Sequence, residues 1–574
     1  MYPPAFVDAS DLLVLVLLGL LVLFFKVRPW LERLVRKIAP RTGLCLLVLA
    51  LFPVVLRLAL LPHHPAPSPE IYDEFSHLLM ADTLLHLRLA NPPHPFPQFF
   101  ETFFVLQQPA YSSIYPIGQG LVLALGRLLF GHPWAGVLLC DAVLCALSYW
   151  MLKAWTTPAW AFAGGLLAVF QFGPLNEWTN CYWGGGVSAI AGCLAFGALP
   201  RICDYGRKRD AVCLGAGLAL QILTRPFESI LLVLSVLLFF LPALSERKNW
   251  RKLARPAFVT LIAVAPAAGL TLLQNRQVTG SWSTLPYMLS RIQYGVPTTL
   301  SFQPLPVPQR ALTREQSAEY NAERSFHGEG PESVRKFSLR LEYRVRYYRF
   351  FFLPPLYLAA FAFVFTLRRF RFAWVALTII IFALGTNFFP YFFPRYMAAV
   401  TCLFLLVSVA GLQRLSSLRI RGNAAGFEAA SLILFACAAS FALWYGLHLT
   451  ENPAAPLGIL RYETWDSITH QNPRRRILVN RQLASLPGKK LVFVRYWPNH
   501  LFQDEWVYNA ADMDHAPVVF ARDLGEQEDQ KLKAYYPDRK TWLLEPDATP
   551  PKLTVYETKP KPALPSGPAF QDVR

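Results

Sequence analysis

Long apolar runs recur along most of this chain and limit what it can fold into. The 574 residues are 54% hydrophobic and only 16% charged. Many runs approach the roughly 20 residues that a helix needs to cross a bilayer. Backbone in lipid must satisfy its own hydrogen bonds, and these runs lack the alternation of a strand. The sequence therefore predicts a polytopic α-helical membrane protein.

We predict about 12 transmembrane helices before residue 450. The first run has no basic residue before it and no small-residue cleavage site after it, so we interpret it as a retained helix and not as a signal peptide. The predicted spans are 11–25, 43–62, 134–152, 155–173, 183–200, 211–224, 228–243, 257–273, 349–367, 373–389, 396–412 and 427–447.

Basic residues in short loops predict the orientation of these helices. The net charge of +18 comes largely from such clusters; the segment 26–42 carries six basic residues and one acidic residue. Clusters of this kind are typical of cytoplasmic loops, so they favour membrane orientation over nucleic-acid binding, and no nucleic-acid partner is expected.

One apolar stretch, Gly118 to Phe130, conflicts with this topology if it crosses the membrane, because every later basic cluster would then face outward. We predict that it is an interfacial helix in the first outer loop. Both termini and the active site then lie on the periplasmic or outer side of a plasma membrane, the inner membrane in a bacterium.

The predicted organisation is a transmembrane domain over residues 1–450 and a small soluble α/β domain over 451–574. The first outer loop covers 63–116 and a long outer loop covers 275–347. Short strands are expected near 490–496, 516–521 and 541–544. The nine cysteines form no CxxC pair, so a disulfide framework or a zinc site is not expected.

Polar and aromatic residues collect at the predicted outer face, and twelve of them are the candidate site residues. An acidic pair opens the set just after a hydrophobic span, and two isolated arginines stand in later outer turns. The candidates are Asp73, Glu74, His77, Tyr115, Gln119, Asn176, Glu177, Trp183, Arg225, Glu228, Arg395 and Tyr396.

Each of these residues also has a structural explanation. Asp73 and Glu74 can cap the helix that begins there, since acids favour a helix N-terminus. Arg225 can pair with Glu228, and isolated arginines can reach lipid headgroups. The aromatic side chains can belong to the interface belt, and His77 can be a packed structural residue.

Taken together, these residue types suit glycosyl transfer from a lipid-phosphate sugar. An outer acid can deprotonate a hydroxyl or amine acceptor. An arginine can hold a phosphate by paired, charge-assisted hydrogen bonds and stabilise it as it leaves. Aromatic rings can stack on a sugar, and grooves between helices can hold a polyprenyl chain.

The chain resembles the C-type (GT-C) integral-membrane glycosyltransferases, and within them the protein O-mannosyltransferases and the lipid A aminoarabinose transferases. Asp73-Glu74 is similar to the Asp-Glu pair of the mannosyltransferase branch. The stretch 115–119, Tyr-Pro-Ile-Gly-Gln, is similar to that branch's His-Pro-Pro-hydrophobic-Gly-Lys entry but departs at its first, third and last polar positions. The role of that lysine is therefore not carried over to Gln119.

The resemblance implies roles for several residues. Asp73 is then the base that activates the acceptor, or a ligand in metal-using relatives, and Glu74 supports it. Glu177 becomes a second carboxylate, and Arg395-Tyr396 matches an outward Arg-Tyr before a late span. Arg225 with Glu228 is a donor-phosphate site on charge and placement alone.

We expect a glycosyltransferase that uses a polyprenyl-phosphate sugar and a glycolipid, glycan or protein acceptor. No cofactor is assigned, and a divalent cation such as Mg²⁺ or Mn²⁺ stays open. The main competing function is that of a multi-pass transporter or lipid flippase, for which Asp141 is the main charge within a span. Two more functions stay open: a ligase or polymerase of lipid-linked glycans, and a noncatalytic scaffold.

Overall fold

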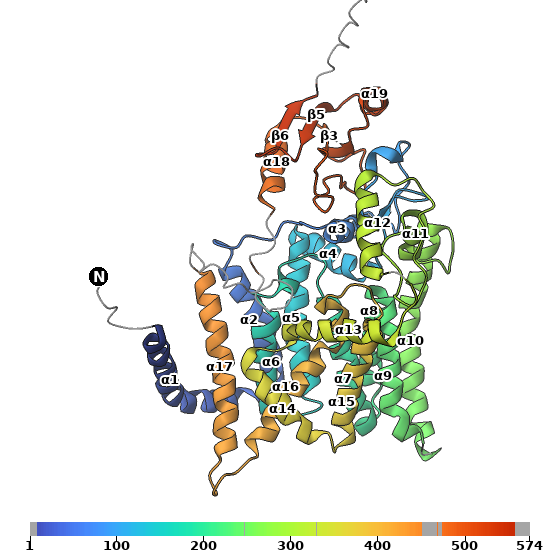
Figure 1. The fold of residues 1–574 in the computed structure, drawn as a ribbon. Helices are drawn as coiled ribbons and strands as arrows, with labels where there is room; N and C mark the ends of the chain where they lie inside the picture. Colours follow the sequence, from blue (N-terminus) through green and yellow to red (C-terminus); the bar gives the residue numbers. More distant parts are fainter. Residues whose placement is uncertain (1–8, 246, 329, 450–467, 469–472, 557–574) are drawn as a thin grey trace, which may run out of the picture.

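The computed structural model describes residues 9–245, 247–328, 330–449, 468 and 473–556, with a helical part and a smaller mixed sheet beyond one end of it (Figure 1). Within these residues seven helices are long and apolar enough to cross a membrane, or eight if one bent pair is a single span. The chain is a polytopic helical membrane protein. The seven are α2 (Thr42–Ala59), α5 (Pro133–Leu152), α7 (Gly186–Tyr205), α9 (Pro226–Leu244), α10 (Arg247–Thr279), η6 with α16 (Pro394–Val400, Thr401–Ser416) and α17 (Ala425–His448).

The remaining predicted spans fall on helices outside that set. Two of them, α6 and α15, are shorter apolar helices, and α14 belongs to a pair bent by 111°. The count of twelve spans therefore stays a prediction. The helices are α1 (Ala9–Ile38), α6 (Pro158–Phe172), α8 (Lys208–Thr224), α14 (Tyr357–Phe363) with η5 (Val364–Thr366), and α15 (Phe370–Thr386).

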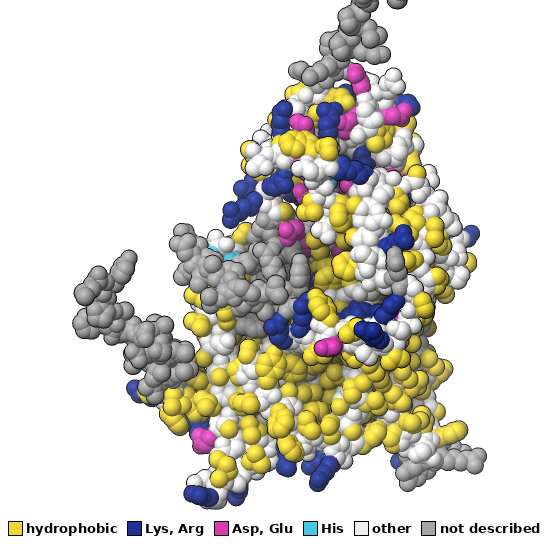
Figure 2. All heavy atoms as spheres, in the orientation of Figure 1, with side chains coloured by type: hydrophobic (Ala, Val, Ile, Leu, Met, Phe, Trp, Pro, Cys, Tyr) yellow, Lys and Arg dark blue, Asp and Glu magenta, His cyan; other side chains and the backbone are white. Residues whose placement is uncertain are grey.

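A band of hydrophobic side chains covers the face of the helical part seen in Figure 2, whereas charged side chains gather around the sheet and at the opposite end. Large apolar residues such as Ile230 and Leu237 on α9, and Phe258 and Leu261 on α10, are exposed in this band. Exposed apolar side chains in such number are expected where a helix faces lipid.

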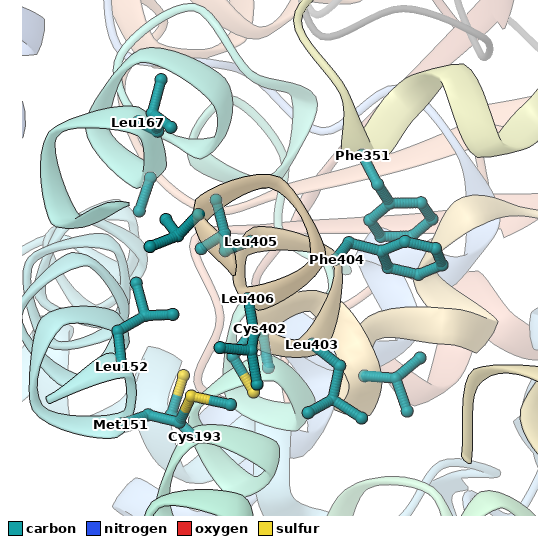
Figure 3. Packing of buried hydrophobic residues seen from close by; sticks show 14 of the residues in the cluster. Met151, Leu152, Leu167, Cys193, Phe351, Cys402, Leu403, Phe404, Leu405 and Leu406 are labelled. Carbon is teal, nitrogen blue, oxygen red and sulfur yellow. The ribbon is translucent and has the colours of Figure 1, made fainter. Parts of the chain in front are cut away.

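The centre of the helical part is α16, whose residues from Thr401 to Leu412 are all buried. A helix that is apolar on every side belongs inside a bundle. Figure 3 shows its leucines among side chains of neighbouring helices, with Phe404 stacked on Phe351 at a ring separation of 4.5 Å. Gly192 of α7 lets the backbones approach closely, because a Cβ there would lie 1.7 Å from the carbonyl oxygen of Ala399.

Two groups of loop helices lie between the membrane helices and the sheet (Figure 1). The loop predicted at 275–347 begins later, since α10 continues to Thr279, and it is largely helical. The first group is α3 (Tyr72–Leu85), η1 (Pro97–Phe100), β1 (Val105–Leu106), β2 (Ser112–Ser113) and α4 (Ile117–Phe130); the second is α11 (Pro286–Tyr294), α12 (Arg314–His327), α13 (Val334–Val345), η3 (Arg346–Phe351) and η4 (Pro354–Leu356).

The C-terminal residues form a four-stranded sheet in the order β4-β3-β5-β6, flanked by two helices. The central strand β3 is buried throughout and pairs in parallel with β4 and β5, while β6 runs antiparallel to β5. The predicted domain boundary at 450/451 and both chain ends lie outside the described residues. The elements are α18 (Arg474–Ser485), β3 (Lys490–Val494), β4 (Val518–Arg522), α19 (Glu526–Tyr535), β5 (Lys540–Glu545) and β6 (Lys552–Val555).

The sheet packs on the first outer loop. Phe99 and Phe100 of η1 share one buried apolar cluster with Leu491 and Phe493 of β3. The buried guanidinium of Arg522 on β4 pairs with Glu315 of α12 and, at 3.1 Å, with Glu505. The cluster and the ion pairs together attach the C-terminal part to both loop groups.

Candidate active site

A cavity of about 980 Å³ lies where the loop helices meet the ends of the membrane helices. Its wall comes from parts of the chain that are far apart in sequence: the first outer loop, the turn before α7, the α8–α9 and α15–η6 junctions, the end of α10, the long loop, and the C-terminal part. Ten of the twelve predicted site residues line it. They are Asp73, His77, Tyr115, Gln119, Glu177, Trp183, Arg225, Glu228, Arg395 and Tyr396.

Asp73 is the second residue of α3 and is 6% exposed. Its Oδ1 accepts a hydrogen bond from the Tyr115 hydroxyl. Burial raises the pKa of Asp73 to about 7; the Tyr115 hydrogen bond and the charge of Arg395 oppose this rise, and the charge of Glu319 adds to it. A carboxyl group with a pKa near neutrality can exchange a proton with a substrate at ordinary pH.

His77, one helical turn after Asp73, stacks on the Tyr115 ring with centroids 4.3 Å apart. Burial, with a smaller contribution from the charges of Arg225 and Arg395, lowers its pKa to about 3. His77 is therefore neutral, and it helps to fix the ring that donates to Asp73. Its Nδ1 has no hydrogen-bond partner among the described residues.

Glu74 points away from the cavity and serves the backbone. Its Oε1 accepts from the N–H of Tyr182 at 2.8 Å, and its Oε2 accepts from Glu70 at 2.9 Å and Ile71 at 3.3 Å. The carboxylate thus occupies the third position of α3 and satisfies N–H groups at the helix start. In this position it holds the start of the helix and does not line the cavity.

Arg395 is the most deeply buried cation of the cavity, at 1% exposure. One Nη2 hydrogen bond joins it to Glu177, and its Cζ lies 3.2 Å from the centroid of the Trp183 ring. Its Nε and Nη1 have no hydrogen-bond partner within the part of the chain that the structure describes. A buried guanidinium with unpartnered N–H groups can donate a charge-assisted hydrogen bond to an oxyanion.

Arg225 stands beside this group at the end of α8. Its Nη1 donates to Glu228 Oε1 at 3.1 Å, and its Cζ lies 5.0 Å from the Tyr396 ring. The carboxylate of Glu228 is 3% exposed and compensates part of its charge. The predicted pairing of these two residues is present, and the pair faces the same cavity.

Gln119 and Asn176 hold the turn that carries Glu177 and Trp183. Gln119 Nε2 donates to the Tyr182 carbonyl at 2.7 Å. Asn176 Oδ1 accepts from the Trp178 N–H at 2.8 Å, and its Nδ2 donates to the Gln171 carbonyl at 2.9 Å. Asn176 lies behind the cavity wall, so it positions the turn and does not meet a ligand.

Two carboxylates of the long loop are in the site but were not predicted. Glu319 and Glu323 lie one turn apart on α12 and line the cavity. Burial raises the pKa of Glu319 to about 7; it raises that of Glu323 well above its usual value, and the neighbouring charge of Glu319 adds to that rise. The i, i+4 spacing behind a capping box at Thr313 and Gln316 is a sequence signal that could have found them.

The C-terminal part also reaches the cavity, through Arg474, Arg475 and Arg476 at the start of α18 and through Gln503 and Asp504. Arg476 is buried, with its Cζ 4.5 Å from the Phe75 ring and 4.6 Å from the Trp506 ring. This contact places the C-terminal part directly against α3.

Among the described residues no three His, Cys, Asp or Glu side chains come together as metal ligands. Asp141, the charge within a predicted span, is buried on α5 beside Cys145, whose Sγ lies 3.5 Å from Oδ1, and it does not line the cavity.

No family model matches this chain, and no curated protein matches it either. Several solved structures do match it. The chain is similar to ArnT from Cupriavidus metallidurans. In the apo state that structure gives a TM-score of 0.48 and 14% identity over 88% of this chain and 93% of ArnT. For ArnT bound to undecaprenyl phosphate the TM-score is 0.48 and the identity is 12%, over 86% of this chain and 92% of ArnT.

A further similar structure is the oligosaccharyltransferase of Archaeoglobus fulgidus tethered to an acceptor peptide. Its TM-score is 0.44, with 12% identity over 88% of this chain and 69% of that one. Because the TM-scores lie below 0.5, we draw no function from these likenesses and argue it from the side chains of the cavity.

Proposed function

We propose that this protein is a glycosyltransferase that moves a sugar from a polyprenyl-phosphate donor to an acceptor on the outer face of the membrane. Asp73 is the general base, and Arg395 binds the phosphate. The acceptor is a hydroxyl or amine group of a glycolipid, glycan or protein.

The observation that carries this proposal is that one cavity holds both a carboxyl group and an unsatisfied guanidinium. Asp73 has a pKa near 7, and Arg395 is close enough for its charge to act on that pKa. A base and an anion site at short range are the two groups that this displacement requires.

Arg395 is arranged for phosphate. Leaving a buried N–H donor unpaired costs about 1–3 kcal/mol, and a phosphate oxygen beside the guanidinium can satisfy one of the two unpartnered donors. Glu177 holds the third nitrogen and the Trp183 ring supports the plane, so the fork is set in position before a ligand arrives. Arg225 adds a second positive charge as the phosphate leaves.

The reaction is a direct displacement with inversion. The acceptor oxygen or nitrogen forms a bond to the anomeric carbon while the bond from that carbon to the phosphate oxygen breaks. The acceptor proton moves to Asp73, and the electron pair of the broken bond leaves with the polyprenyl phosphate. The hydrogen bond from Tyr115 occupies Oδ1 and leaves Oδ2 of Asp73 for the acceptor proton.

Helices that line the cavity suit a polyprenyl chain. Phe227 of α9, Thr271 of α10 and Met288 of α11 line it, and α9 and α10 expose large apolar side chains on their outer faces. A polyprenyl chain can therefore lie against these helices while its phosphate reaches Arg395.

Sugar transfer in reconstituted liposomes tests the proposal. Labelled polyprenyl-phosphate sugars are supplied with an envelope acceptor fraction, with and without chelator. We expect transfer by the wild type and a loss of about 10²-fold or more in Asp73→Asn. The control is Glu342→Gln, an exposed carboxylate of α13 outside the cavity. Full transfer by Asp73→Asn would refute the assignment, and the chelator arm decides the metal requirement.

A further inference from the structure

The two glutamates of α12 form a second polar wall of the cavity that the displacement does not use. Glu319 and Glu323 are 4% and 5% exposed, and both face the space that Asp73 also lines. The charge of Asp73 acts on Glu323, and that of Glu319 acts on Asp73, so the three carboxyl groups share one region.

One carboxyl oxygen of each glutamate accepts a hydrogen bond that holds the side chain in position. Glu319 Oε1 accepts from the Tyr72 hydroxyl at 3.0 Å, and Glu323 Oε2 accepts from the Thr298 N–H. Glu319 Oε2 and Glu323 Oε1 accept no hydrogen bond from any residue that the structure describes. The side chains are thus held in position, while one oxygen of each is available to a ligand.

Aromatic rings complete this wall. Tyr287 of α11 and Tyr391 line the same cavity as Glu323, and both are half-buried. Burial raises the pKa of the Tyr287 hydroxyl, so it stays a neutral donor. Rings beside carboxyl oxygens are the usual lining of a site that binds a polyhydroxylated, partly apolar ring.

Independent of the glutamates, two more buried groups indicate that a ligand fills this space. Arg395 has two unpartnered donors, and His77 has an unpartnered Nδ1 at 8% exposure, both counted within the described residues. Arg395 and His77 come from different elements and line the same cavity as α12. A polar ligand in the cavity can supply partners for these atoms.

We propose that Glu319 and Glu323 bind the hydroxyl groups of the sugar carried by the donor, and that they select which sugar is transferred. This inference rests on the proposed function, because it places the sugar between α12 and Asp73 while Arg395 holds the phosphate. Hydroxyl groups donate to the two available carboxyl oxygens. A sugar that lacks such a hydroxyl leaves a buried acceptor unpaired and is bound less tightly.

The test compares two lipids that differ only in the sugar. Full-length protein in nanodiscs is titrated with undecaprenyl phosphate and with undecaprenyl phosphate bearing a hexose or a pentose. The variants are Glu319→Gln, Glu323→Gln and the double variant, with exposed Glu342→Gln as the matched control. Thermal unfolding of each variant is recorded alongside.

We expect the wild type to bind at least one sugar-bearing lipid more tightly than the sugar-free one. The double variant should lose 10-fold or more in affinity for that lipid and keep its affinity for undecaprenyl phosphate. When one hydroxyl of the donor sugar is replaced by hydrogen, the affinities of the wild type and the double variant should differ less than they do for the complete sugar.

Equal losses for both lipids, or no loss for either, would overturn the sugar subsite and leave the phosphate site standing. A wild type that binds the sugar-free lipid as tightly as every sugar-bearing one would also overturn it. If folded wild type binds none of the lipids, the proposed function itself fails and the subsite with it.

Discussion

The hydroxyl of Tyr115, at the entry to α4, donates a hydrogen bond to Oδ1 of Asp73, the second residue of α3. The bond stabilises the charged form of a carboxyl group whose burial favours the neutral form. Tyr115 therefore affects which fraction of Asp73 is ionised at a given pH.

Transfer by the wild type should rise with pH and level off above about 7, because only ionised Asp73 accepts the proton. Tyr115→Phe removes a bond that favours ionisation. A hydrogen bond to a charged group is worth about 1.5–3 kcal/mol, so the rising limb should move upward by about one pH unit or more. The pH profile of kcat/KM measures this, and an unmoved limb in Tyr115→Phe would contradict it.

Asp73→Asn should stabilise the protein at pH 8 while it abolishes transfer. The folded pKa of about 7 lies above the ordinary value of 3.8, so Asp73 favours folding below pH 4 and progressively less as the pH rises to 7. Asparagine lacks this dependence. Thermal unfolding of both proteins at pH 5 and pH 8 tests this. The prediction is wrong if the stability of the variant relative to wild type is lower at pH 8 than at pH 5.

Glu74→Gln should destabilise the protein, whereas Asp73→Asn should stabilise it at pH 8. The carboxylate accepts three backbone N–H groups, and an amide presents an N–H₂ where an acceptor is needed. We expect a loss of about 1–3 kcal/mol in stability. Measured with Asp73→Asn as the adjacent control, an unchanged Tm for Glu74→Gln would show that these bonds do not hold α3.

Arg395→Gln should weaken binding of undecaprenyl phosphate by about 10²-fold. Arg395→Lys should recover little, because an ammonium lacks the planar guanidinium that donates to Glu177 and stacks on the Trp183 ring. Glu177 would be left buried without its partner, so Glu177→Gln is combined with Arg395→Gln to separate folding from binding. Exposed Arg276→Gln on α10 is the control. If the Arg395 variants bind undecaprenyl phosphate as tightly as the wild type, the phosphate does not bind at Arg395.

Arg522→Met should loosen the C-terminal part. It leaves Glu315 and Glu505 buried and unpaired, which costs about 3–5 kcal/mol. Hydrogen exchange should rise in β4 and α12 and remain low in α16. Adding Glu315→Gln should restore part of the protection, and uniform exchange across the chain in Arg522→Met would instead indicate global unfolding.

Much of the site could be predicted from where polar residues fall. Arg225, Glu177 and Arg395 each follow or precede an apolar run, and ends of spans on one side of a membrane come together in space. Their roles stay predictions. The direction of Glu74 could not be predicted, because successive residues of a helix point about 100° apart and either acid of the pair could have faced inward.

The sequence signals a capped helix with two glutamates one turn apart at α12, but its place beside Asp73 could not be predicted, for a different reason. Glu319 is 247 residues from Tyr72, its hydrogen-bond partner, and no periodicity in the sequence connects segments so far apart. The same holds for Arg522 and Glu315, which are 207 residues apart. Such contacts depend on how the loops pack, and loops carry the weakest sequence patterns.

The arginines that open α18 belong to the last part of the described chain, whereas Asp73 belongs to the first outer loop, and both line one cavity. During synthesis the membrane helices are made long before Arg474 emerges. The cavity therefore gains its arginine side only after α18 has been made and the C-terminal part has packed on α3. Under the proposed function, a chain that ends before α18 holds Asp73 but lacks one wall of the space in which the sugar would be transferred.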